Sequence, residues 1–201
     1  MKNNIILSLY KKPQTVFTLQ EIALLFPDIS YNNLKKRMSY SAQSGSMKKL
    51  IRGVYAKDQF NVLELANKIY TPSYISLETV LQKAGVTFQY YESTFAISYI
   101  SRTVKVGDHT IVYRRMKKDI LLNKQGIEEQ ESVVIASPER AFLDAVYLYK
   151  DYHFDNLSVL DWNKIKELKK IYGKRMFLKR VEEYFRLYKE EHAWPDKTSS
   201  H

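Results

Sequence analysis

Residues 18–56 carry closely spaced local signals that divide them into two helices and a hairpin, and this order constrains the fold more than any other feature of the chain. The first helix begins at a capping box, because the Thr18 hydroxyl can accept from the Glu21 amide while the Glu21 carboxylate accepts from the Thr18 amide. Pro27 ends this helix, since proline cannot continue the helical hydrogen-bond ladder. A serine then provides the cap for a second helix over residues 30–43.

A hairpin is predicted directly after the second helix. Two short β-prone runs within residues 49–56 flank Arg52-Gly53, and a glycine at the turn is typical of a tight connection between antiparallel strands. Two helices followed by a hairpin are the order of a winged helix-turn-helix, in which the hairpin is the wing. We therefore interpret residues 1–70 as a winged helix-turn-helix DNA-binding domain.

Positive charge is concentrated in the same region. From residue 29 to residue 57 the chain has no acid and seven basic residues, namely Lys35, Lys36, Arg37, Lys48, Lys49, Arg52 and Lys57. Residues 1–90 hold twelve basic and five acidic residues, a difference of +7, whereas residues 91–201 hold twenty and seventeen, a difference of +3. The formal net charge of +10 favours a polyanionic partner, and its distribution favours the N-terminal region as the part that contacts phosphate.

The predicted second helix has two chemically different sides. At 100° per residue its apolar side contains Leu34, Met38, Ser41 and Ala42, and the opposite side is polar. Asn and Gln can form two hydrogen bonds with a base edge, and Lys and Arg can contact phosphate or guanine. A solvated face of an ordinary amphipathic helix would show the same pattern, and only the basic hairpin that follows favours nucleic acid. The candidate DNA-binding residues are Asn32, Asn33, Lys35, Lys36, Arg37, Tyr40, Gln43, Lys48, Lys49 and Arg52.

The rest of the chain completes an α+β pattern. We interpret residues 71–195 as a C-terminal interaction domain made of a small antiparallel sheet plus helices, with a loose tail after Pro195. Helices are predicted over residues 61–70, 76–84, 137–149, 161–173 and 174–191, and β-structure over residues 103–113 and 132–135.

Several chemistries have no support in the sequence. The absence of cysteine excludes disulfides, thiolate zinc sites and a cysteine nucleophile. The chain has no P-loop, no Gly-x-Ser-x-Gly, no His-Glu-x-x-His and no dinucleotide-binding glycine pattern, and its four histidines lack metal-ligand spacing. We therefore expect no cofactor, no metal and no enzymatic activity. Without a signal peptide or an apolar run of membrane-spanning length, a cytoplasmic protein with no membrane contact is expected.

Three motifs in this order resemble a known family. The hairpin sequence RGVY at residues 52–55 is followed by TPSYISLE at residues 71–78 and by SPERAFLD at residues 137–144. Over roughly residues 15–150 the chain thereby resembles the AbiEi antitoxins of type IV toxin–antitoxin and abortive-infection systems, which act in phage defence. The resemblance implies an autorepressor that binds repeats in its own promoter through the winged domain. It also implies that the C-terminal domain counters a nucleotidyltransferase-like toxin, without a stable complex being required.

Other classes of function stay open at this point. The chain could be a stand-alone winged-helix transcription regulator without a toxin, or a protein-interaction module whose basic helix and hairpin grip an acidic partner. A nuclease or another enzyme acting on nucleic acid would need carboxylates that converge in space and a metal dependence. The sequence alone gives neither the operator nor a residue that contacts the toxin.

Overall fold

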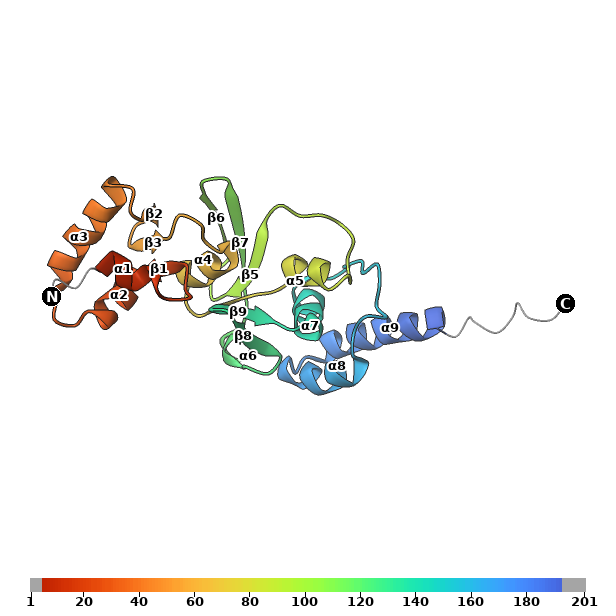
Figure 1. The fold of residues 1–201 in the computed structure, drawn as a ribbon. Helices are drawn as coiled ribbons and strands as arrows, with labels where there is room; N and C mark the ends of the chain where they lie inside the picture. Colours follow the sequence, from red (N-terminus) through yellow and green to blue (C-terminus); the bar gives the residue numbers. More distant parts are fainter. Residues whose placement is uncertain (1–4, 193–201) are drawn as a thin grey trace.

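The computed structural model describes residues 5–192 and has a mixed α+β fold with two separate sheets (Figure 1). A three-stranded antiparallel sheet lies with the first helices, and a six-stranded sheet lies between that region and the C-terminal helices. The α+β class that the sequence predicts is confirmed. Within the described residues, no helix combines the length and the apolar character needed to cross a bilayer.

The two predicted helices and the hairpin follow one another in the predicted order, and a further helix and strand precede them. In chain order these elements are α1 (Ile5–Tyr10), β1 (Val16–Thr18), α2 (Leu19–Leu25), α3 (Tyr31–Gln43), β2 (Lys48–Ile51) and β3 (Val54–Ala56). β3 pairs antiparallel with β2, which confirms the predicted hairpin, and with β1 on its other side. The sequence does not predict β1, because three residues are too few to show the alternation of a strand.

Local capping decides where the first helices begin and end. Thr18 Oγ accepts from the Glu21 backbone N–H (3.1 Å), and the Glu21 carboxylate accepts from the Thr18 backbone N–H (2.8 Å), so the predicted capping box is confirmed. Ser30 occupies the N-cap position of α3, but its side chain makes no capping hydrogen bond. Beyond the C-cap Ser44, Gly45 has a φ of +75°, a left-handed conformation that glycine adopts without strain.

An apolar cluster packs the N-terminal helices against the small sheet. α3 contributes Leu34 and Met38, whose side chains have no exposed surface. Burial of this apolar surface stabilises the packing of the helices and fixes which side of α3 faces solvent. The cluster comprises Ile5, Leu9, Phe17, Leu19, Ile22, Leu34, Met38, Met47 and Tyr55.

The larger sheet has the strand order β6-β7-β5-β4-β9-β8. Its strands and the helices between them are α4 (Val62–Ile69), β4 (Ser73–Ile75), α5 (Glu78–Lys83), β5 (Thr94–Ser98), β6 (Arg102–Val106), β7 (His109–Arg115), α6 (Lys118–Leu122), β8 (Ile127–Gln130) and β9 (Val133–Ala136). β5 pairs parallel with β7 and β4 pairs parallel with β9, whereas the other neighbouring strands are antiparallel.

The expectation of a small antiparallel sheet in this region needs correction, because the sheet has six strands and mixed directions. The predicted β-structure over residues 103–113 is confirmed as the β6–β7 hairpin, and the run over residues 132–135 is confirmed as β9. The sequence does not reveal β4, whose parallel partner is distant in the chain: Ile75 pairs with Ile135. A pairing over such a separation leaves no local turn signal.

The C-terminal helices pack at the end of the larger sheet that lies away from α3 (Figure 1). They are α7 (Pro138–Leu148), α8 (Trp162–Leu168), a 3-10 turn (Lys169–Ile171) and α9 (Arg175–His192). Ser137 and Asp161 cap α7 and α8 through their side chains, as predicted. The predicted loose tail after Pro195 lies outside the described residues.

α4 packs into the same core as the larger sheet. Leu65 and Ala66 have no exposed surface and belong to one apolar cluster with residues of β4, β5 and β9. The Asn67 side chain accepts from the Val134 backbone N–H (2.8 Å) and donates to the Ser73 carbonyl (3.4 Å). The division at residue 70 stays a prediction, and a fragment that preserves this core would have to include α4.

Candidate nucleic-acid interface

The predicted polar side of α3 faces solvent. Leu34, Met38 and Ser41 are buried on the other side of the helix, so the apolar and polar sides that the sequence predicts are those of the structure. Tyr40 has 71% of its surface exposed, which leaves its ring available to a partner rather than to the core. The exposed candidates on this helix are Asn32, Asn33, Lys35, Lys36, Arg37, Tyr40 and Gln43.

A short connection with buried Met47 at its end fixes the hairpin relative to α3. Met47 is 2% exposed, and its backbone N–H donates to the Ser41 carbonyl (3.2 Å) at the end of the helix. From α1, the Tyr10 hydroxyl donates to the Ser46 carbonyl (3.2 Å). The structure therefore brings the candidates of α3 and those at the start of β2 onto adjoining elements, and Figure 1 shows both at one end of the molecule.

Two of the seven cations in the basic region are already engaged. Lys48 forms an ion pair with Asp58 (2.8 Å) and also donates to the Asp58 carbonyl, so the acid just beyond the basic stretch neutralises one of its members. Lys57 donates to the carbonyls of Tyr10 and Lys12. Within residues 5–190, five cations of this region have neither an acid within 4.0 Å nor a side-chain hydrogen bond to a carbonyl, namely Lys35, Lys36, Arg37, Lys49 and Arg52.

The hairpin is short and held against the helices. Its turn contains exposed Arg52 and then Gly53. The φ of Gly53 is +78°, a left-handed conformation that glycine adopts without strain. The Gly53 carbonyl accepts from the Leu19 backbone N–H (2.7 Å), which holds the turn beside the start of α2. Arg52 is therefore presented from a turn that is anchored to the same helix that packs against α3.

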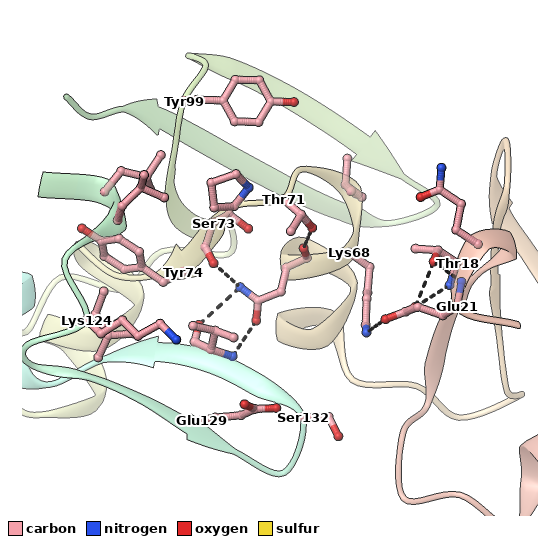
Figure 2. A pocket seen from close by; sticks show the side chains of 18 of the residues that line it. Thr18, Glu21, Lys68, Thr71, Ser73, Tyr74, Tyr99, Lys124, Glu129 and Ser132 are labelled. Carbon is pink, nitrogen blue, oxygen red and sulfur yellow. Dashed lines mark hydrogen bonds and ion pairs between the residues drawn. The ribbon is translucent and has the colours of Figure 1, made fainter. Parts of the chain in front are cut away.

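An ion pair and hydrogen bonds connect this region to α4. Glu21 of α2 pairs with Lys68 of α4, as Figure 2 shows, and Glu64 accepts from the backbone N–H (2.8 Å) and the hydroxyl (2.6 Å) of Thr15. Burial opposes ionisation of Glu21, but the hydrogen bonds from Lys68 and Thr18 outweigh it and hold its pKa below the ordinary value. α2 is thus fastened to the core that α4 shares with the larger sheet.

A pocket of about 730 Å³ lies beside this connection (Figure 2). Its polar walls are largely engaged, since Glu21 is held by Lys68 and the Asn67 amide by backbone groups. Lys124 and Glu129 line another part of it. None of the candidate DNA-binding residues lines this pocket, so it is separate from the cationic surface.

The two longer motifs of the AbiEi resemblance meet in the core. Tyr74 and Ser76 come from the first, and Arg140 and Asp144 come from the second. The Asp144 carboxylate accepts from Tyr172 (2.7 Å), Ser76 (2.8 Å) and Tyr74 (3.2 Å), and its side chain has no exposed surface. Because Ser76 is engaged in this way it does not cap α5, which begins at Glu78 rather than at residue 76 as predicted.

Arg140 completes this buried network. Its guanidinium lies 3.4 Å from Asp144 and donates to the carbonyls of Ile120 (2.7 Å) and Gln125 (3.0 Å) and to the Tyr74 hydroxyl (3.1 Å). Burial raises the pKa of Asp144, and Arg140 together with the hydroxyl donors acts in the opposite direction. Sequence reasoning missed this pair, although an Arg and an Asp four residues apart in an apolar helix are a signal for it.

Among the residues that the structure describes, no group of three or more His, Cys, Asp or Glu side chains is placed to hold a metal ion. Glu139 is buried beside Lys164 (3.0 Å), where it also accepts from Ser137 (2.9 Å). Burial opposes its ionisation, but the hydrogen bonds outweigh that effect and its pKa lies below the ordinary value. These contacts join α7 to α8 and serve packing.

No protein-family model matches this chain, and no curated protein matches it.

Proposed function

We propose that the chain binds duplex DNA through α3 and the β2–β3 hairpin, as a winged helix-turn-helix transcriptional repressor. The supporting observation is the set of five cations that, among the described residues, have neither an acidic partner nor a hydrogen bond to a carbonyl, on elements that pack against a buried core. Cations that contact phosphates release condensed counterions and thereby supply affinity. The first turns of the second helix in such a domain meet base edges in the major groove.

The polar residues beside the cations favour DNA over an acidic protein partner. Asn32 and Asn33 are exposed in the first turn of α3, about one turn before Lys36 and about two turns before Tyr40. An acidic protein would need only the cations, whereas the asparagine amides offer the paired donor and acceptor that match an adenine edge. The candidate base-reading residues are therefore the asparagines, and the cations position them.

A salt titration of DNA affinity tests this proposal, with anisotropy of a labelled duplex as the measurement. Lys36→Ala should lower the magnitude of the log–log salt slope by about one, because one phosphate contact is lost. Lys48→Ala is the matched control and should change the slope less, since Asp58 already neutralises Lys48. Wild-type affinity that ignores salt, or an acidic polypeptide bound more tightly than duplex, would overturn the proposal.

We further propose that this repressor is the antitoxin of a type IV system that counters a nucleotidyltransferase-like toxin. The support is the resemblance over roughly residues 15–150. The longer motifs supply Arg140, Asp144, Tyr74 and Ser76 to the core, so they assign no residue to toxin contact. The operator would be a repeat in the chain's own promoter, bound through α3.

Growth rescue by truncated variants tests the antitoxin role. A variant lacking residues 1–57 keeps α4 and should lose promoter repression while still protecting cells that express the toxin encoded beside it. A variant ending at Ala136 lacks α7, and with it Arg140 and Asp144, and should protect poorly. If residues 1–57 alone rescued growth as well as the full chain, the protein would be a repressor without an antitoxin domain.

A further inference from the structure

A second group of cations surrounds a hollow far along the chain from α3. The hollow encloses about 510 Å³ at the junction of β7, α6 and α7, and its lining residues are Arg115, Met116, Lys117, Lys118, Asp119 and Tyr147. The three cations are exposed, and within residues 5–190 none of them lies within 4.0 Å of an acid. Asp119 lines the same hollow and still forms no ion pair with them.

The backbone that carries these cations is fixed. Met116 is 3% exposed and its backbone N–H donates to the Ser98 carbonyl (2.9 Å), so its side chain is anchored in the core between exposed Arg115 and Lys117. The Arg115 backbone N–H donates to Ser101 Oγ (3.0 Å). Cations on a fixed backbone lose less conformational freedom when they bind a ligand than cations on a mobile loop.

Tyr147 forms the aromatic wall of the hollow, and a lysine outside the lining contacts its ring. Lys174, just before α9, places its Nζ 4.9 Å from the centroid of the Tyr147 ring. The Tyr147 ring is itself packed against Tyr172 (5.5 Å between centroids) and Phe177 (5.9 Å). These ring contacts fix Tyr147, so the aromatic wall of the hollow is held in place.

We propose that this hollow binds a small polyphosphate, either inorganic or the polyphosphate chain of a nucleotide. Three cations and one carboxylate line a space of about 510 Å³, which lies within the range of small-molecule sites. Arg115 can bond two phosphate oxygens at once, and the lysines act as point charges on the others. The cations gather around a single hollow, which suits a compact ligand with several negative charges. This proposal does not rest on DNA binding by α3.

Calorimetric titration of the full chain with pyrophosphate, ATP and orthophosphate at constant ionic strength tests it. Pyrophosphate and ATP should bind, and orthophosphate should bind more weakly because it reaches fewer cations. Lys117→Gln with Lys118→Gln should weaken binding by about tenfold or more, since two charge-assisted contacts are lost. Asp119→Asn should bind more tightly than wild type. All these side chains are exposed, so the thermal unfolding midpoints should match wild type.

The matched control is Lys35→Gln with Lys36→Gln on α3, which should lower DNA affinity and leave polyphosphate affinity unchanged. Equal affinity for pyrophosphate and ATP would identify the phosphate chain as the whole ligand, and tighter ATP binding would add the nucleoside to it. Absence of binding, or binding unchanged by loss of Lys117 and Lys118, would overturn the proposal. It would also be overturned if Lys117→Gln with Lys118→Gln weakened only duplex binding. The hollow would then be part of a nucleic-acid surface.

Discussion

Arginine is used in opposite ways at two places in this molecule. Arg37 on α3 is exposed and has no acidic partner, whereas Arg140 in α7 has no exposed surface and contacts Asp144, Tyr74 and three carbonyl groups. Removing a charged group from water costs on the order of several kcal/mol. An ion pair and hydrogen bonds must offset this cost for the group to stay charged in the core. The exposed cations carry no such cost and stay available to phosphate.

The two arginines show that a conspicuous sequence motif can serve the core rather than the binding surface. Arg140 and Asp144 lie in one of the two eight-residue motifs, and they hold α7 against β4 and the segment around α6. Asn32 and Lys36, which we propose to contact DNA, lie in none of the three motifs. They are set apart by their exposure on a helix whose other side is buried.

The largest expected effect comes from breaking the buried pair. Arg140→Ala should lower the free energy of unfolding by about 3–5 kcal/mol, because Asp144 is left as an uncompensated buried charge. Arg37→Ala is the matched control on the exposed surface and should change it by less than about 0.5 kcal/mol. Urea unfolding followed by circular dichroism measures both.

A double variant sharpens this result. Replacing Arg140 by Met and Asp144 by Leu removes both charges together and should cost less than Arg140→Ala alone, because no unpaired charge remains. If Arg140→Ala cost no more than Arg37→Ala, the pair would contribute nothing to stability, and the contrast between the two arginines would fail.

The next effect concerns recognition on the exposed side. Asn32→Ala should weaken binding to the preferred duplex by about 1–3 kcal/mol and leave binding to random duplex nearly unchanged, if its amide makes two bonds to one base. The preferred duplex is obtained by selection from random sequences. The unfolding midpoint should not change, since Asn32 is exposed. Equal losses on both duplexes would make Asn32 a residue that positions the helix rather than one that reads sequence.

How far sequence reasoning reaches differs between the same two regions. The capping box at Thr18, the α3 sides and the hairpin at Gly53 were all predictable, because each is specified by neighbours within a few residues. The ion pair between Lys48 and Asp58 closes across the hairpin, and no local signal in the sequence predicts it. Local chemistry thus predicts the candidate surface but not which of its cations are free.

The contacts around Asp144 in the core could not be predicted from the sequence. Asp144 is reached by Tyr74 and Tyr172, which come from before and after it in the chain, and the parallel pairing of β4 with β9 brings distant strands together. Such contacts depend on packing of the whole sheet and leave no periodic signal in any one segment. Sequence reasoning therefore recovered the C-terminal helices and missed what joins them to the sheet.

A smaller effect tests the local part of this contrast. Thr18→Ala should lower the free energy of unfolding by about 0.5–2 kcal/mol, because the Glu21 backbone N–H loses its acceptor. Ser30→Ala is the matched control, since Ser30 has the same N-cap position on α3 but makes no capping bond. It should change stability by a few tenths of a kcal/mol at most, roughly the cost of an exposed substitution. Equal losses would show that the capping bond is not what stabilises α2.

The smallest expected effect is the pH dependence of the Glu21–Lys68 pair. The pKa of Glu21 is lowered in the folded chain from its ordinary value of 4.5, so its ionised form stabilises the fold above that pH, and this contribution is lost as the pH falls through the folded value. Glu21→Gln should therefore lower the free energy of unfolding by about 0–1 kcal/mol near neutral pH, a small range because the pair is partly exposed. The difference in this free energy from wild type should shrink below about pH 4.5. Lys68→Gln should reduce the same pH-dependent part, because it removes the partner that lowers the pKa. Urea unfolding at several pH values measures the difference, and a difference that stayed constant with pH would mean that the carboxylate charge of Glu21 does not stabilise the junction between α2 and α4.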